Sequence, residues 1–312
     1  MRRSRVTLQS LVHGVLGGLD NAANTIIESP RGRVFKISHS AAKVDGFTIR
    51  NGKGDPGGGV LLNSGAVVNC VIRDNRSGGS GGGIAAYTIA PKSIVNCLIL
   101  NNSAGMGGGI GMGGTGGKDF ALLIRNCLIA GNSADGGKDW AGGGGVWVDQ
   151  GSYAIIESCT IAGNSATHAK GGFGGGVRVR NCNGSCPPVF LTNSIVYGNT
   201  ATVGNNYYCI NNQKGTWLHS CTEPSFEKAD ASMVFSDPLF EGDGHYTLQQ
   251  TSPCIDTGKI QAWMMEAKDL AGADRILKVR YAPNVDMGAY EASKEVKDKA
   301  PGRSGTAEPN RP

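Results

Sequence analysis

The stretch SGGGIAAYTIAPKSIVNCLILNN, residues 80–102, decides the fold of this chain. It places three consecutive glycines before a short apolar segment and adds a second short segment that ends in asparagine. Three glycines in a row contribute nothing to a hydrophobic core and weaken the interior of a helix or strand. The backbone itself must therefore require them, and the same order of residues recurs along the chain.

The glycine tracts and the segments that follow them repeat in step. The tracts are GGGV at 57–60, GGGI at 81–84, GGGI at 107–110, GGGGV at 142–146 and GGGV at 174–177. The segments are GFTIRNG at 46–52, NCVIRDN at 69–75, NCLILNN at 96–102, NCLIAGN at 126–132, SCTIAGN at 158–164 and NSIVYGN at 193–199. Each segment alternates with a period of two, as a β-strand does, and no helical pattern separates the segments. The chain therefore reads as an all-β solenoid.

In a solenoid of this kind the coils stack in parallel register about 4.8 Å apart, so equivalent residues form columns. One inward column is Phe47, Cys70, Cys97, Cys127, Cys159 and Ser194, and a second is Ile49, Ile72, Ile99, Ile129, Ile161 and Val196. A third column is expected to form an asparagine ladder at a corner with left-handed backbone: Asn75, Asn102, Asn132, Asn164 and Asn199. The glycine tracts mark sharp turns where a side chain would meet its own copy one coil away.

These repeats resemble the right-handed parallel β-helix proteins of bacterial surfaces, which have the pectin-lyase-like fold, and are similar to those of polymorphic outer-membrane proteins. The segment 236–291, with SDPLFEGDGHYTLQQTSPCIDTGK, DLAGADRI and APNVDMGAYE, resembles the module that closes secreted β-helix proteins of the choice-of-anchor type. The resemblance covers about residues 5–291. It implies a right-handed parallel β-helix with an irregular C-terminal cap.

We therefore expect a parallel β-helix at 5–204, a C-terminal capping module at 205–291 and a disordered tail at 292–312. The opening MRRSRVTLQSLVHGVLGGL lacks the pattern of a signal peptide and its segment RVTLQS reads as a strand, so the chain is expected to begin inside its fold. The cap carries Asp237, Asp256, Asp286 and Glu291, which are expected to hold turns by accepting N–H groups, with a calcium ion as the alternative. No other cofactor and no metal site is expected.

The nine cysteines fall into two groups. Those of the inward column are expected to be free stacked thiols, because parallel neighbours do not converge as zinc ligands must. The other five lie in loops or in the cap, where one or two disulfides are plausible. Cys182–Cys186 and Cys221–Cys254 are the pairs we consider first, although the sequence does not determine the pairing.

Two long loops, in SADGGKDWA and SATHAKGGF, should lie next to each other on one lateral face. The candidate catalytic residues there are Asp135, Asp139, His168, Lys138 and Lys170. The candidate sugar-binding residues, chosen because aromatic rings stack on sugars, are Trp140, Trp147, Tyr153 and Phe173. The plain alternative is a solvated corner with a few ion pairs.

Composition narrows the function further. A net charge of +5 with its basic residues scattered does not indicate a nucleic-acid partner, and no run of about 18 apolar residues indicates a membrane span. The catalytic motifs of polygalacturonases and the acidic cluster of calcium-dependent pectate lyases do not occur in the sequence. We expect an extracellular or bacterial cell-surface monomer that binds polysaccharide. A polysaccharide lyase or glycoside hydrolase, and an adhesin or stalk without a small-molecule site, remain the alternatives.

Overall fold

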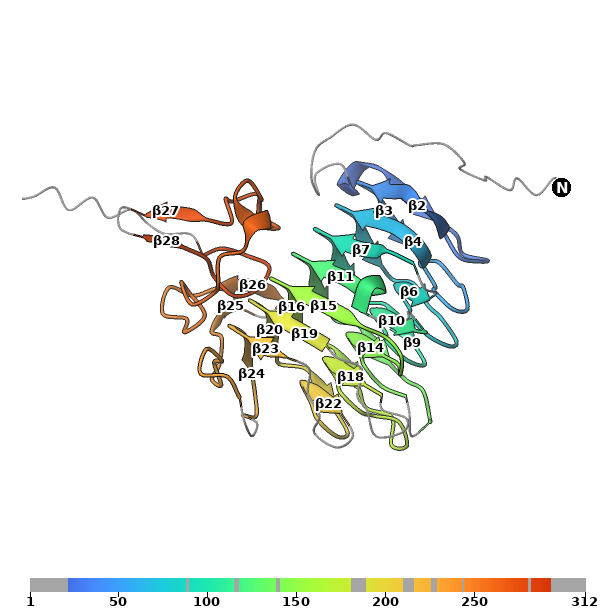
Figure 1. Ribbon diagram of the computed structural model, residues 1–312. Coiled ribbons are helices and arrows are strands. Elements are labelled where there is room, and N and C mark those ends of the chain that lie inside the picture. Colours follow the sequence, from blue (N-terminus) through green and yellow to red (C-terminus); the bar gives the residue numbers. More distant parts are fainter. Residues whose placement is uncertain are drawn as a thin grey trace, which may run out of the picture.

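The computed structural model describes residues 22–87, 90–114, 118–138, 141–180, 189–209, 216–225, 229–242, 244–279 and 282–292. Within these residues the strands form three parallel sheets, here sheets A, B and C, which wind together as a solenoid (Figure 1). Of the tail expected at 292–312, residue Ala292 is buried in the C-terminal module, and 293–312 lie outside the described residues, as does the expected start of the β-helix at 5–21.

The strands follow one another from coil to coil in each sheet. Sheet A consists of β1 (Ile26–Glu28), β3 (Thr48–Arg50), β5 (Val71–Arg73), β8 (Leu98–Leu100), β12 (Leu128–Ala130), β16 (Thr160–Ala162), β20 (Ile195–Tyr197) and β24 (Cys221–Thr222). Sheet B contains β22 (Tyr207–Cys209), β18 (Val177–Val179), β14 (Val146–Val148), β10 (Ile110–Gly113), β6 (Ile84–Tyr87), β4 (Val60–Val68), β7 (Lys92–Val95), β11 (Leu122–Arg125), β15 (Ala154–Glu157), β19 (Val189–Thr192), β23 (Trp217–Leu218) and β2 (Phe35–Asp45). Sheet C consists of β9 (Ser103–Ala104), β13 (Ser133–Ala134), β17 (Ser165–Ala166) and β21 (Thr200–Ala201). The hairpins β25 (Phe240–Gly242) with β26 (His245–Leu248), and β27 (Leu277–Val279) with β28 (Ala282–Asn284), come later, and short 3₁₀ turns η1 (Lys118–Phe120) and η3 (Ala262–Met264) complete the set.

The register of the strands confirms the predicted columns. Ile49, Ile72, Ile99, Ile129, Ile161 and Val196 pair in an unbroken row across sheet A. These side chains and the column cysteines are fully buried and form one core with the inward residues of sheet B. Burial of this continuous apolar stack is the main stabilising term of the fold.

The asparagine ladder is present, but it lies inside the solenoid. Nδ2 of Asn102 donates to Oδ1 of Asn132 at 3.0 Å, and Nδ2 of Asn132 donates to Oδ1 of Asn164 at 2.9 Å. The same pattern joins the other asparagines of the column, and all of them are buried. Our assignment of left-handed backbone to these residues was one position too late, because the residue before each carries the positive φ, as Asp74 (57°) and Asn101 (54°) do. The chain turns there, and the next side chain can then point into the core.

The glycine tracts provide both left-handed backbone and close approach to the next coil. The first glycine of a tract has left-handed backbone, with φ of 59° at Gly107. The second is pressed against the next coil, since a Cβ on Gly108 would lie 2.3 Å from the carbonyl oxygen of Ser133. Any larger residue would therefore force neighbouring coils apart.

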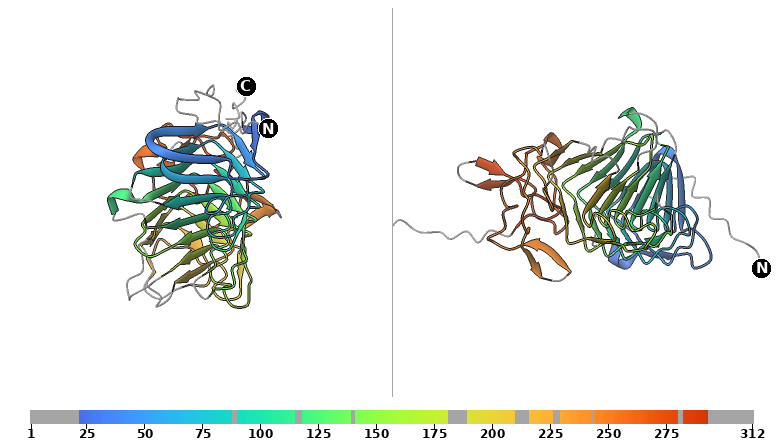
Figure 2. Two further views of the ribbon diagram at one scale, coloured as in Figure 1. Left: turned by 90° about the vertical axis from the view of Figure 1, so that its right-hand side faces the viewer. Right: turned by 90° about the horizontal axis from the view of Figure 1, so that it is seen from below.

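The C-terminal segment does more than cover the end of the solenoid. Ala229, Met233 and Phe235 pack against the end of the main core, as a cap should. Residues 237–292 instead lie against the outer side of sheet A, where Ala289 N donates to Thr160 Oγ1 at 3.0 Å (Figures 1 and 2). The solenoid ladders also continue beyond residue 204, as far as Thr222.

Three of the four predicted turn carboxylates, Asp237, Asp286 and Glu291, act as hydrogen-bond acceptors in this module. Asp237 Oδ1 accepts from Leu239 N at 2.8 Å, and Asp286 accepts from the N–H groups of Asp256 and Ala292. Glu291 Oε2 accepts from Asp286 N at 3.0 Å. The carboxylates therefore organise the loops of the module through its backbone.

Cys70, Cys97, Cys127 and Cys159 are buried free thiols, as expected. Cys221 and Cys254 are also free, so the disulfide expected between them is not formed in this structure, whereas Cys209 is disulfide-bonded. The expected pair Cys182–Cys186 lies outside the described residues.

Candidate functional site

One lateral face of the solenoid carries the loops that connect the asparagine ladder to the glycine tracts. We call it the loop face and define it as residues 53–56, 76–80, 103–106, 133–138, 165–173 and 200–203, together with the strands of sheet C that they contain. Its backbone is fixed by coil-to-coil hydrogen bonds such as Ser133 N to Asn102 O at 2.9 Å. Side chains on this face are therefore presented on a rigid, regularly spaced scaffold.

The structure brings four of the predicted residues to this face. Asp135 and Lys138 lie on one loop, His168 and Lys170 lie on the loop of the next coil, and all four side chains are exposed. The imidazole of His168 packs on the first loop, since a Cβ on Gly137 would lie 2.8 Å from its Cε1. Lys170 N donates to Nδ1 of His168 at 3.2 Å, which fixes the orientation of the ring. Asp139 and Trp140 lie outside the described residues.

A charged contact links these loops to an earlier coil. The guanidinium of Arg76 lies 3.9 Å from the carboxylate of Asp135, and both side chains are largely exposed. An ion pair of this kind is worth about 0–1 kcal/mol and is screened by salt. Both groups can therefore exchange this contact for a ligand at little cost.

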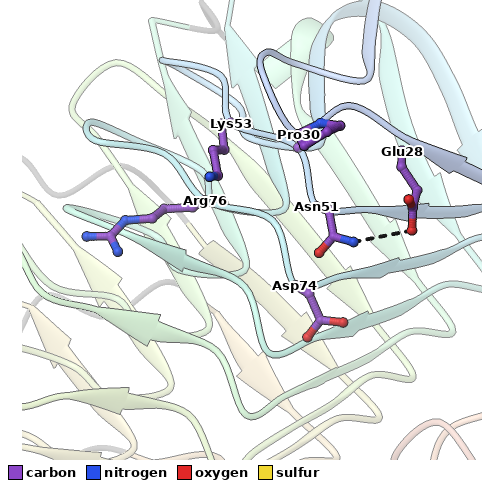
Figure 3. Close-up of a pocket in the computed structure, with 7 residues that line it drawn as sticks. Glu28, Pro30, Asn51, Lys53, Asp74 and Arg76 are labelled. Atoms are coloured by element: carbon purple, nitrogen blue, oxygen red, sulfur yellow. Dashed lines mark hydrogen bonds between the residues drawn. The ribbon is translucent and has the colours of Figure 1, made fainter.

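Beside Arg76 is a polar hollow that the sequence did not reveal. Its volume is about 240 Å³, and it is lined by Glu28, Pro30, Asn51, Gly52, Lys53, Asp74 and Arg76 (Figure 3). Asn51 Nδ2 donates to Glu28 Oε1 at 3.2 Å, on the side of the hollow away from Lys53 and Arg76. We refer to these lining residues as the hollow.

The hollow follows from the corner geometry. Asn51 and Asp74 both have φ of 57°, so each occupies the left-handed corner position before a buried residue and projects its side chain outward. These two residues were visible in the sequence as the sixth residue of the repeated segments GFTIRNG and NCVIRDN. In later coils glycine holds this position at 131, 163 and 198, and no side chain projects there.

The charges of the hollow are unevenly balanced. Glu28 forms an ion pair with Arg50, and Asp74 forms one with Arg73 at 2.5 Å. The acids are thus compensated by arginines on sheet A, whereas Lys53 adds positive charge on the side that faces the loops, and Arg76 adds more when it leaves its weak contact with Asp135. The local field favours an anionic group there.

Two of the four aromatic candidates, Trp147 and Phe173, do not present a free ring face. Trp147 is 3% exposed, because the preceding glycine tract folds over the outer side of β14. Phe173 is half-buried and lies over the guanidinium of Arg178 at 4.7 Å, which Tyr208 also contacts at 4.5 Å, and the two rings are 4.9 Å apart. Tyr153 is half-buried. Trp147 therefore offers no ring face to a sugar, and Phe173 is occupied by a cation–π contact.

The described residues were expected to hold neither a metal site nor a membrane span. They contain no group of three or more His, Cys, Asp or Glu side chains arranged to hold a metal ion. Among the helices that the structure describes, none has the length and apolar character needed to cross a bilayer.

Comparison with known proteins adds no relative. No protein-family model, no curated protein and no solved structure matches this chain.

Proposed function

We propose that this protein is an extracellular or bacterial cell-surface protein that binds an acidic polysaccharide along its loop face. The carrying observation is the hollow, where Lys53 and Arg76 add positive charge beside paired acids on a rigid stack of coils. The hollow is smaller than the roughly 300–1,000 Å³ of sites for drug-sized ligands, so it suits one sugar unit of a longer chain.

The rest of the loop face supplies contacts for further sugar units. Lys138 and Lys170 continue the positive charge toward later coils, while within the hollow Asn51 and Asp74 offer hydrogen-bonding groups to hydroxyls. A polymer can therefore gain affinity from several weak contacts in a row. The disulfide at Cys209 supports an oxidising location, because such bonds persist outside the cytosol.

Affinity electrophoresis in gels containing polygalacturonate, alginate or neutral dextran tests this proposal. The protein should be retarded by the acidic polymers, and the double variant Lys53→Ala/Arg76→Ala should bind about 5–30-fold more weakly, for two contacts of about 0.5–1 kcal/mol each. Rising salt should weaken the retardation.

The matched control is Lys36→Ala/Lys259→Ala, which removes the same charge at exposed lysines outside the loop face. Equal losses in both double variants would reduce the effect to net charge. Unchanged binding by Lys53→Ala/Arg76→Ala would remove the hollow from the site, and an absence of retardation by every polymer would favour an adhesin or stalk.

A polysaccharide lyase or glycoside hydrolase on the same face is the second candidate. The contact of His168 with the loop of Asp135 and Lys138 favours it, because it brings possible acid and base groups together. A product assay on acidic and neutral polysaccharides should compare the wild type with Asp139→Ala and His168→Ala. An activity that survives in both variants would place any catalysis elsewhere.

A further inference from the structure

Two buried thiols meet where the C-terminal module contacts the solenoid. Cys221 lies in β24, the last strand of sheet A, and Cys254 belongs to the module. Both are 0% exposed and lie in one apolar cluster with Ile195, Leu248 and Met287. Sγ of Cys221 donates to Ser236 O at 3.3 Å and is also within hydrogen-bonding reach of the Cys254 thiol.

The cysteines of the inward column are also within hydrogen-bonding reach of one another, as Cys97 and Cys127 are, but the strands that carry them are parallel. They occupy equivalent positions on successive parallel strands, so their side chains point the same way into the core. Each makes the same local contact, as Cys97 Sγ does with Val95 O at 3.2 Å and Cys127 Sγ does with Arg125 O at 3.1 Å. A disulfide needs Cβ atoms that approach each other, and a parallel column does not provide this. Cys221 and Cys254 instead come from two separate elements that face each other.

We propose that Cys221 and Cys254 are a disulfide-forming pair that fastens the C-terminal module to the last coil. In the reaction the two thiols lose two protons and two electrons and form one S–S bond. A low-molecular-weight disulfide such as oxidised glutathione accepts the electrons and protons and leaves as two thiols. The reaction proceeds through a mixed disulfide on one of the two cysteines.

The fold explains when this bond forms and what it does. The Cys254 thiol and burial both raise the pKa of Cys221, so the attacking thiolate is disfavoured once the module has docked. Oxidation therefore belongs to folding or to transient opening of the module. The module is otherwise held by contacts such as Lys259 N to Asn193 Oδ1 at 2.7 Å, at the end of a solenoid where unravelling begins.

Peptide mapping of the full chain tests the proposal directly. The protein is refolded in oxidised glutathione or in dithiothreitol, unfolded in the presence of an alkylating reagent, and digested. We expect a cross-linked Cys221–Cys254 peptide only in the oxidised sample, while Cys70, Cys97 and Cys127 are recovered as alkylated thiols. Recovery of Cys221 and Cys254 as alkylated thiols from the oxidised sample would overturn the proposal, as would cross-links within the column.

A stability measurement gives the second readout. The bond closes a loop of about 33 residues, for which the chain-entropy relation predicts a rise of roughly 5–10 °C in melting temperature on oxidation. Because dithiothreitol also reduces the disulfide at Cys209, the rise is assigned by comparison with Cys254→Ser, which should lose it. Cys127→Ser is the matched control and should keep it. A rise that persists in Cys254→Ser would contradict the link.

Discussion

The substitution Asn132→Ala tests how much the internal asparagine ladder contributes to the stability of the coils. Asn132 is 0% exposed. Its Oδ1 accepts from the backbone N–H and from Nδ2 of Asn102, at 2.9 and 3.0 Å. Its Nδ2 donates to Ile99 O at 2.8 Å and to Asn164 Oδ1 at 2.9 Å. Alanine removes all of these contacts from a site that water does not reach.

The expected loss follows from these contacts. The backbone N–H of Asn102 loses its acceptor and remains buried, which costs about 1–3 kcal/mol. The other hydrogen bonds contribute about 1 kcal/mol each, and a small cavity adds to the loss. We therefore expect Asn132→Ala to lower the free energy of unfolding by about 3–6 kcal/mol, measured by urea denaturation with fluorescence and circular dichroism.

Two comparisons separate hydrogen bonding from packing. Asn132→Leu restores the volume but not the hydrogen bonds, so it should be nearly as unstable as the alanine variant. Asn101→Ala changes an exposed neighbour with φ of 54° and should cost no more than about 1 kcal/mol. A leucine variant within 1 kcal/mol of the wild type would refute the reasoning, because packing alone would then account for the ladder.

Three further predictions concern the glycine turns and two buried ionisable groups. Gly108→Ala would place a Cβ 2.3 Å from a carbonyl oxygen of the next coil, so this variant should be far less stable in urea than Gly198→Ala. Gly198 has φ of 66° but open space around it. Similar losses of about 1 kcal/mol in the two variants would show that the close approach of the coils does not matter. Burial lowers the pKa of Lys92 to about 8, so Lys92→Met should raise the free energy of unfolding by about 1–3 kcal/mol at pH 7, and a loss at pH 7 would contradict this. Burial raises the pKa of Glu291 to about 8 despite the ion pair with Arg275, so the folded state holds a proton that the unfolded state releases above its ordinary pKa near 4.5. Stability should therefore fall as the pH rises from about 4.5 to 8, and Glu291→Gln should flatten that dependence in urea titrations at several pH values; an unchanged slope in the variant would contradict it.

The coil architecture was predictable from the sequence because parallel stacking repeats one environment. Glycine, cysteine, isoleucine and asparagine recur in phase, and each residue type fits the column that it occupies. The position of the left-handed residue was harder to assign. Asp74 and Asn75 both tolerate that backbone, and only the structure shows that the first turns while the second bonds inside.

The position of the C-terminal module against the solenoid could not be predicted from the repeats. Its contacts join residues far apart in the chain, as the hydrogen bond between Ala289 and Thr160 does. A solenoid has an apolar end and, here, an outer sheet face that is also partly apolar, since Ile195 joins the cluster of the module. A high content of aromatic and apolar residues shows that a segment packs against another apolar surface. It does not distinguish the end from the side.

Two of the aromatic candidates, Trp147 and Phe173, are covered or occupied for a local reason that bears on where a ligand could bind. The turns close over the outward side chains of sheet B: a Cβ on Gly143 would lie 2.8 Å from Cβ of Trp147, and Phe173 lies over the guanidinium of Arg178 at 4.7 Å. The indole ring of Trp147 is therefore buried beneath the glycine turn. Residues that the stacking itself requires are consequently unavailable to a ligand. The proposed recognition therefore rests on side chains that the coil geometry leaves free to vary, such as Lys53 and Arg76, and these residue types do not recur from coil to coil in a way that the sequence could reveal.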